Sequence, residues 1–119
     1  MTLKSQVVAL LLLGFFATGA WADKRDEAKA QVAFGILAAQ ANLWREAVYR
    51  FERASQIDPT YAAAYNNLGV AYEQAGEIEK ARAAYTRALE LDPKNLFIAQ
   101  NQDLFRELYD RPTKCDDRH

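Results

Sequence analysis

The fold is decided by the stretch from Ile57 to Pro93, which reads IDPTYAAAYNNLGVAYEQAGEIEKARAAYTRALELDP. Its opening Ile-Asp-Pro returns 34 residues later as Leu91-Asp92-Pro93. Further pairs fall into the same register: Phe34-Gly35 with Leu68-Gly69, Ala38 with Tyr72, Ala47 with Ala81, Phe51 with Tyr85 and Ala54 with Ala88. So many matches at one fixed interval are the signature of a repeat protein.

Each repeat is predicted to be a hairpin of two helices, because its large apolar residues recur at helical spacing. The four helices are expected over residues 26–41, 43–57, 62–75 and 78–91. Gly76 ends the third of these helices, since glycine enters the left-handed C-cap conformation without steric cost. Asn42 takes the same place in the first repeat, and Pro93 stops the fourth helix because the residue before a proline is pushed out of helical geometry.

Gly69 is expected in the middle of a helix, where glycine costs about 1 kcal/mol relative to alanine. A close approach of the second helix of the hairpin would offset that cost. We expect the small residue Ala81 to lie opposite Gly69.

These residues resemble the tetratricopeptide-repeat (TPR) consensus. The resemblance rests on Tyr65-Asn66-Asn67-Leu68-Gly69-Val70-Ala71-Tyr72, then Gly76, Ala81, Tyr85, Ala88 and Leu91-Asp92-Pro93. The first repeat is less close, since Gln31 and Ala38 replace aromatic residues. The resemblance implies an all-α, TPR-type superhelix with repeats over about residues 28–61 and 62–95, and it implies protein binding without naming the partner.

A further helix is expected over about residues 96–110, with Asn95 as its N-cap. It is not a third repeat, because Gln102 and Asp103 occupy the positions of Leu68 and Gly69. Its apolar residues predict an amphipathic capping helix that turns a polar side outward. They are Phe97, Ile98, Leu104, Phe105, Leu108 and Tyr109. Residues 111–119 are expected to form a polar tail, so the TPR domain spans residues 23–110.

The N-terminus has the order of a secretory signal peptide. Residues 1–6 carry one cation, Lys4, and no acid, and residues 7–16 (VVALLLLGFF) are all apolar or glycine. Ala20-Trp21-Ala22 then offers a small-x-small cleavage site, which predicts a signal peptide over residues 1–22 and a periplasmic or secreted protein. An uncleaved membrane anchor is the alternative, although the charge-free stretch is at the short end of the roughly 17–25 residues that span a bilayer.

Composition and side-chain inventory argue against several functions. The net charge is −1, with both signs interspersed, so no basic patch indicates nucleic acid as a partner. The only histidine, His119, and the only cysteine, Cys115, lie in the tail. No catalytic motif, cofactor loop or metal-ligand set is present, so we expect no enzyme activity and no cofactor. Because Cys115 is the only cysteine, any disulfide it forms would be with another chain, and the sequence does not decide whether it forms one.

The resemblance also places a binding surface on the first helix of each repeat. The candidate protein-binding residues on this concave face are Val32, Ile36, Asn66, Asn67, Val70 and Glu73. The alternative is that the two asparagines are ordinary helix residues and that the capping helix covers Val70. A carboxylate clamp, another TPR specificity, would use the positions of Val32, Ile36, Asn67, Phe97 and Asn101. Only Asn67 matches, which argues against such a clamp.

The sequence therefore predicts a non-catalytic adaptor or scaffold, exported to the cell envelope, that binds a protein or peptide and is not inserted in the membrane after signal cleavage. Two alternatives remain. The first is a self-associating module in which copies stack end to end, because two repeats are fewer than the three that a solenoid usually needs. The second is an accessory subunit of an envelope enzyme complex.

Overall fold

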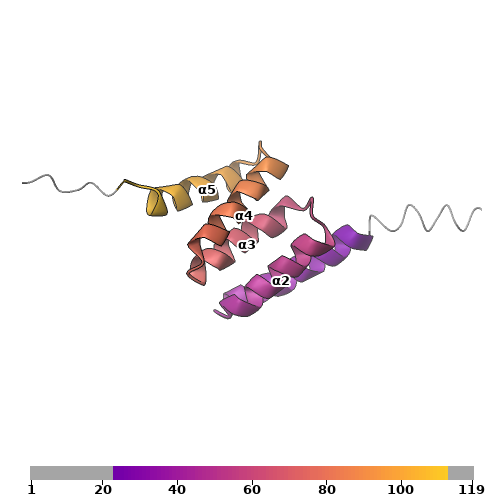
Figure 1. Ribbon diagram of the computed structural model, residues 1–119. Coiled ribbons are helices and arrows are strands. Elements are labelled where there is room, and N and C mark those ends of the chain that lie inside the picture. The colour runs from indigo at the N-terminus through magenta and orange to yellow at the C-terminus, as the bar shows by residue number, and fades with distance from the viewer. Residues whose placement is uncertain (1–22, 113–119) are drawn as a thin grey trace, which may run out of the picture.

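The computed structural model describes residues 23–112, which are helical with no strand among them. The first helix covers residues 23–40 and is followed by α2 (Trp44–Ile57), α3 (Ala62–Gln74), α4 (Ile78–Leu91) and α5 (Leu96–Tyr109). Figure 1 shows them stacked in chain order, from the indigo first helix to the yellow α5. The predicted all-α superhelix is confirmed. The expected signal peptide and Cys115 lie outside the described residues.

The ends of the helices follow the local signals in the sequence. Asn42 and Gly76 both have positive φ, at 62° and 80°. After Asn42, the Leu43 amide donates to the Ala38 carbonyl, and after Gly76 the Glu77 amide donates to Tyr72 in the same way. Both hairpins thus turn through the same left-handed cap, which glycine and asparagine tolerate best.

A glycine lies under an aromatic ring in each hairpin. A Cβ atom added to Gly69 would lie 2.7 Å from Cδ1 of Tyr85, and one added to Gly35 would overlap the ring of Phe51. The close approach expected at Gly69 is therefore confirmed, and the three atoms nearest to the added Cβ belong to the ring of Tyr85; that Ala81 also lies opposite Gly69 stays a prediction. The ring of Tyr85, one helical turn further along α4, fills the space.

The two hairpins pack through α2 and α3. Tyr72 donates a hydrogen bond from its hydroxyl to Glu52 of α2, and burial together with this bond raises the pKa of Tyr72. On the same side of α3, Ala64, Leu68 and Ala71 are all buried. The contact between Tyr72 and Glu52 belongs to the surface through which the second repeat stacks on the first.

The last helix, α5, packs on α4 through a narrow stripe. Its Ile98 and Phe105 are buried, and the ring of Phe105 lies 5.3 Å from that of Tyr85. The opposite side carries the exposed polar residues Gln100, Asp103 and Glu107, as expected of a capping helix.

The other large apolar residues of α5 are not covered. Phe97, Leu104 and Leu108 are 67%, 52% and 69% exposed, and Tyr109 is also exposed. The apolar side of α5 is therefore wider than the stripe that packs on α4, and these four residues extend beyond that contact. No second helix follows α5 within the described residues to pair with it.

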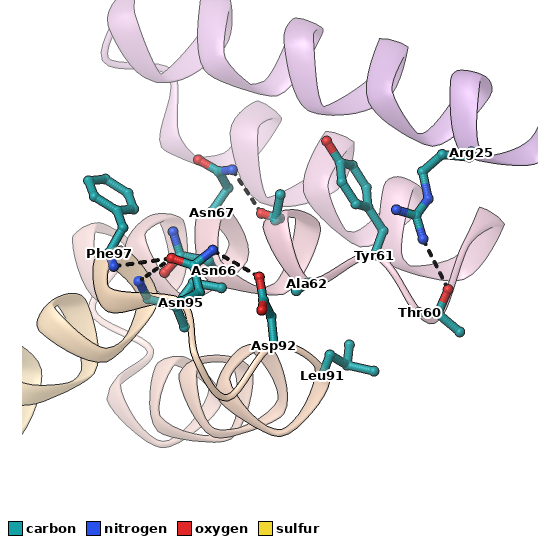
Figure 2. A pocket seen from close by; sticks show the side chains of 12 residues that line it. Arg25, Thr60, Tyr61, Ala62, Asn66, Asn67, Leu91, Asp92, Asn95 and Phe97 are labelled. Atoms are coloured by element: carbon teal, nitrogen blue, oxygen red, sulfur yellow. Dashed lines mark hydrogen bonds between the residues drawn. The ribbon is translucent and has the colours of Figure 1, made fainter.

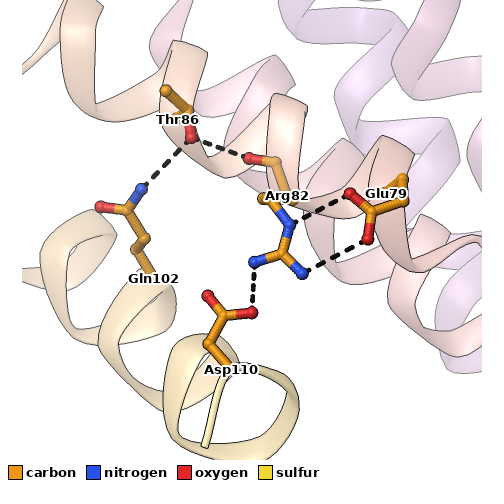
Figure 3. Close-up of polar contacts among 5 residues, drawn as sticks. All are labelled: Glu79, Arg82, Thr86, Gln102 and Asp110. Atoms are coloured by element: carbon orange, nitrogen blue, oxygen red, sulfur yellow. Dashed lines mark hydrogen bonds and ion pairs between the residues drawn. The ribbon is translucent and has the colours of Figure 1, made fainter. Parts of the chain in front are cut away.

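Polar contacts supplement this limited packing (Figure 3). Arg82 of α4 pairs with Glu79 of its own helix and with Asp110 at the end of α5. The hydrogen bonds to the two carboxylates raise the pKa of Arg82. Gln102 donates to the hydroxyl of Thr86 at 3.4 Å, which is a weak contact. These contacts are exposed, so each contributes little to stability.

Candidate protein-binding site

A pocket of about 430 Å³ opens between the first helix, α3 and the start of α5 (Figure 2). The first helix contributes Arg25, α3 contributes Asn66 and Asn67, and α5 contributes Phe97 and Ile98. Because α3 starts and α5 starts at the same end of the stack, the first turns of both helices meet at this pocket. Its wall is partly polar and partly apolar, as in many sites that bind peptides or small molecules.

One corner of the pocket is held by an ion pair. Arg25 donates from Nε to the carboxylate of Asp58, and from Nη2 to Thr60 Oγ1 at 3.1 Å. Its guanidinium carbon also lies 4.7 Å from the ring centre of Tyr61. Partial burial raises the pKa of Asp58, but the hydrogen bonds from Thr60 and Arg25 outweigh it and lower that pKa below 3.8. The corner thus keeps a carboxylate charged and a cation oriented beside the pocket.

Asn66 connects α3 to α5. It is 6% exposed, and its Oδ1 accepts a hydrogen bond from Asn101 Nδ2 at 3.1 Å. A buried carboxamide needs such a partner, because an unpaired polar group in a protein interior costs free energy. Asn66 therefore positions α5 over α3 and forms part of the pocket wall.

Asn67 and Phe97 present their side chains to the pocket differently. Asn67 is half-buried and donates from Nδ2 to the Ala63 carbonyl at 2.8 Å. Within residues 23–112 its Oδ1 accepts no hydrogen bond. Phe97 follows the N-cap Asn95, whose side chain accepts from the amides of Phe97 and Ile98. The pocket thus offers a hydrogen-bond acceptor beside an exposed aromatic ring.

The predicted site residues are only partly brought together. Asn66 and Asn67 line the pocket, whereas Val32, Ile36, Val70 and Glu73 do not. Val32 is buried at 6% exposure and Ile36 is exposed at 39%. Val70 packs against the core. Glu73 accepts a hydrogen bond from the Tyr85 hydroxyl at 2.9 Å, and burial and this bond raise the pKa of Tyr85. Participation of the six residues in binding stays a prediction.

Sequence reasoning did not assign Arg25 or Phe97 to the site. Arg25 precedes the first repeat, so no register position pointed to it. Phe97 stands 34 residues after Ala63, which the resemblance to TPR proteins also places on the concave face, and this correspondence was the signal that could have identified Phe97. Within the described residues no group of acidic, histidine or cysteine side chains is arranged to hold a metal ion, and no helix is long and apolar enough to cross a membrane.

Two family models match the repeats. The model of the tetratricopeptide repeat matches residues 62–95, and a second model of the TPR repeat matches residues 39–76. The first match coincides with the second repeat as the sequence predicted it. The second match spans α2 and α3, and so covers parts of both hairpins.

Similar proteins carry the same repeat. The chloroplastic tetratricopeptide repeat domain-containing protein PYG7 of Arabidopsis thaliana is 31% identical over 85 residues, which are 71% of this chain and 28% of that protein. The protein O-mannosyl-transferase TMTC2 of Homo sapiens is 37% identical over 62 residues, 52% of this chain and 7% of that protein. The chain thus spans less than a third of either relative.

The solved structures give the same fold. The Arabidopsis OM64 TPR domain superposes with a TM-score of 0.68 at 22% identity, and the match covers 74% of this chain and 73% of that chain. Identity at this level supports the fold alone. Together with the two family models, the 34-residue period and the stacked hairpins, it leads to one conclusion: the chain belongs to the tetratricopeptide-repeat family.

Proposed function

We propose that this protein is a non-catalytic adaptor of the cell envelope that binds an extended segment of a protein partner at the pocket between the first helix, α3 and α5. TPR repeats indicate a protein-protein interaction module. The observation that carries the proposal is the combination, at one pocket, of Oδ1 of Asn67, which accepts no hydrogen bond within residues 23–112 and is not buried, and the 67% exposed ring of Phe97.

The surface beside the pocket indicates what kind of segment would bind. Phe97, Leu104 and Leu108 recur at intervals of seven and four residues along one side of α5, and all three are exposed. At the interval of 34, Phe97 and Leu104 correspond to Ala63 and Val70 of the concave face. A partner segment would place one side chain in the pocket, donate a backbone N–H to Asn67 and lay apolar residues along this stripe.

Site-specific photocrosslinking tests this surface. A photoreactive amino acid is placed at position 97, at position 67 or, as a control, at position 53, because Arg53 is exposed on α2 and does not line the pocket. We expect the same partner to be crosslinked from positions 97 and 67 and not from position 53. Phe97→Asp is expected to lower the affinity for that partner at least about tenfold. Equal crosslinking from all three positions would place the binding surface elsewhere.

Export is a separate part of the proposal, supported by the order of the N-terminal residues. We expect the protein in the periplasm, if the source is a bacterium, with Asp23 as its first residue after cleavage. N-terminal sequencing of the protein from cell fractions tests this. A protein that retains Met1 and stays in the membrane fraction would favour the uncleaved anchor.

A further inference from the structure

We propose that the outer face of the first helix is a homodimer interface, on which a second copy of this chain packs antiparallel about a twofold axis. This N-terminal face consists of Ala30, Phe34, Leu37 and Ala41, and all four residues are exposed. Phe34 and Leu37 are 54% and 61% exposed. They are the large apolar side chains at its centre.

The repeat itself shows what such a face does when it has a neighbour. At the interval of 34, Ala30, Phe34 and Leu37 correspond to Ala64, Leu68 and Ala71. These counterparts are 0%, 6% and 0% exposed in α3, which packs on α2 of the first repeat as well as on α4 of its own hairpin. The first helix therefore carries a stacking surface of the same register with no neighbouring repeat among the described residues, although the guanidinium carbon of Arg50, from its own hairpin, lies 5.5 Å from the ring centre of Phe34. Repeat proteins relieve such a condition by capping or assembly.

The order of residues on the N-terminal face selects a second copy of the chain. Ala30, Phe34, Leu37 and Ala41 are separated by four, three and four residues, and they read small, large, large, small. This order is the same in both directions. A twofold axis between Phe34 and Leu37 therefore packs each Phe34 against Leu37 of the second copy, as an isologous interface requires. Spacings of four and three residues also form the seam of paired helices.

Charges at the two ends of the face support the antiparallel direction. Asp26 and Glu27 lie near its N-terminal end, and Arg45 is exposed in the first turn of α2 near its other end. None of the three forms an ion pair within residues 23–112. In the antiparallel arrangement the acids of each copy approach Arg45 of the other copy at both rims. A parallel pair would instead place the acids of one copy against the acids of the other.

End-to-end stacking fits the surfaces less well. In that arrangement the N-terminal face would pack on the outer side of α5 of the next copy, where Gln100, Asp103 and Glu107 are exposed. Phe34 and Leu37 cannot satisfy carboxylates or a carboxamide that they desolvate. The twofold pairing leaves these polar residues in water, and it leaves the pocket at the other side of the first helix open.

Sedimentation equilibrium of the full chain, purified with the N-terminus that the cell leaves, tests the proposal. We compare the wild-type chain with Leu37→Asp and with the matched control Ala33→Asp, which adds the same charge to an exposed residue of the first helix outside the N-terminal face. We expect Leu37→Asp to raise the dimer Kd about 100-fold or more, and Ala33→Asp to change it less than about threefold. Circular dichroism melting identifies any variant that fails to fold.

A wild-type chain that is monomeric at about 100 μM would overturn the proposal. In that case solvent, the preceding residues of the same chain or another protein would cover the face. Equal effects of the two folded variants would overturn the proposal as well. Photocrosslinking from position 97 tests the partner site independently of the dimer, because Phe97 does not belong to the N-terminal face. Failure of the dimer and failure of the partner site are thus distinguishable.

Disulfide trapping tests the direction of the pair. In a Cys115→Ser background, Ala30→Cys and Ala41→Cys are made in separate chains, which are then mixed and oxidised. The antiparallel pair brings position 30 of one copy near position 41 of the other, within the Cβ separation of about 3.5–4.5 Å that a disulfide needs after small adjustments. We expect crosslinked dimers in the mixture and few in either chain alone. Crosslinking of Ala30→Cys alone would indicate a parallel pair and overturn the arrangement.

Discussion

Replacing Gly69 with alanine sets two effects of opposite sign against each other. Alanine in place of glycine inside a helix stabilises by about 1 kcal/mol. The added Cβ atom, however, would lie 2.7 Å from Cδ1 and Cε1 and 2.9 Å from Cγ of Tyr85, whereas carbon atoms in contact prefer about 3.5–4.0 Å. The ring would have to move by a substantial fraction of an ångström, or α3 and α4 would have to separate.

Tyr85 has little room to move. It is 2% exposed, its hydroxyl is bonded to Glu73, and its ring packs against Phe105. Overpacking of this kind costs about 1–3 kcal/mol. Over most of that range the cost is larger than the gain of about 1 kcal/mol from replacing glycine with alanine in a helix. We expect Gly69→Ala to lower the free energy of unfolding by about 1 kcal/mol, measured by urea denaturation with far-ultraviolet circular dichroism.

A double-mutant cycle identifies the cause. In a Tyr85→Leu background the ring is absent, so Gly69→Ala should become neutral or stabilise by up to about 1 kcal/mol. In an Ala81→Gly background it should remain destabilising, because the atoms nearest to the new Cβ belong to Tyr85. Additive effects of Gly69→Ala and Tyr85→Leu would refute the reasoning. Gly35→Ala, beneath Phe51, provides an independent repetition in the first repeat.

Three further perturbations have defined outcomes. Asn66→Ala is expected to lower the free energy of unfolding by about 1–2 kcal/mol, because the hydrogen bond to Asn101 and some packing are lost. Amide hydrogen exchange should then become faster in α5 more than in the first helix. Because the pKa of Asp58 is lowered in the folded protein, its contribution to stability is present above about pH 4 and is lost as the pH falls through its folded pKa; Asp58→Asn should flatten this acid limb in urea melts at pH 2–7. Asn42→Gly should change stability by only a few tenths of a kcal/mol, whereas Asn42→Ala, at φ 62°, should cost about 1 kcal/mol; equal melting temperatures for the two would contradict the left-handed cap.

The sequence was sufficient to predict where the helices begin and end, because these positions depend on local signals. The helix predicted over residues 78–91 is α4 (Ile78–Leu91), and the predicted N-cap Asn95 begins α5. Gly76 and Asn42 adopt the left-handed conformation that their side chains favour. Each of these features depends on a few neighbouring residues, so the interval of 34 and the turn chemistry were enough to predict them.

Features that depend on neighbours in space were harder to predict. Periodicity indicates that α5 is amphipathic, but it does not say how much of its apolar side has a helix to pack against. The predicted binding residues were placed by register alone, and register does not reveal that Asn66 is already bonded to Asn101. Arg25 reaches the pocket because the first helix begins before the repeat does.

The narrow attachment of α5 has a consequence for affinity. A helix held by two buried side chains, the hydrogen bond from Asn101 to Asn66 and a few exposed polar contacts belongs to the least stable part of a structure, which opens without global unfolding. Since α5 supplies one wall of the proposed site, the apparent Kd of a partner equals its intrinsic Kd divided by the fraction of molecules in which α5 is docked. By the same linkage, a bound partner would hold α5 in place. Substitutions at the contact between α4 and α5 would then tune binding without touching the partner.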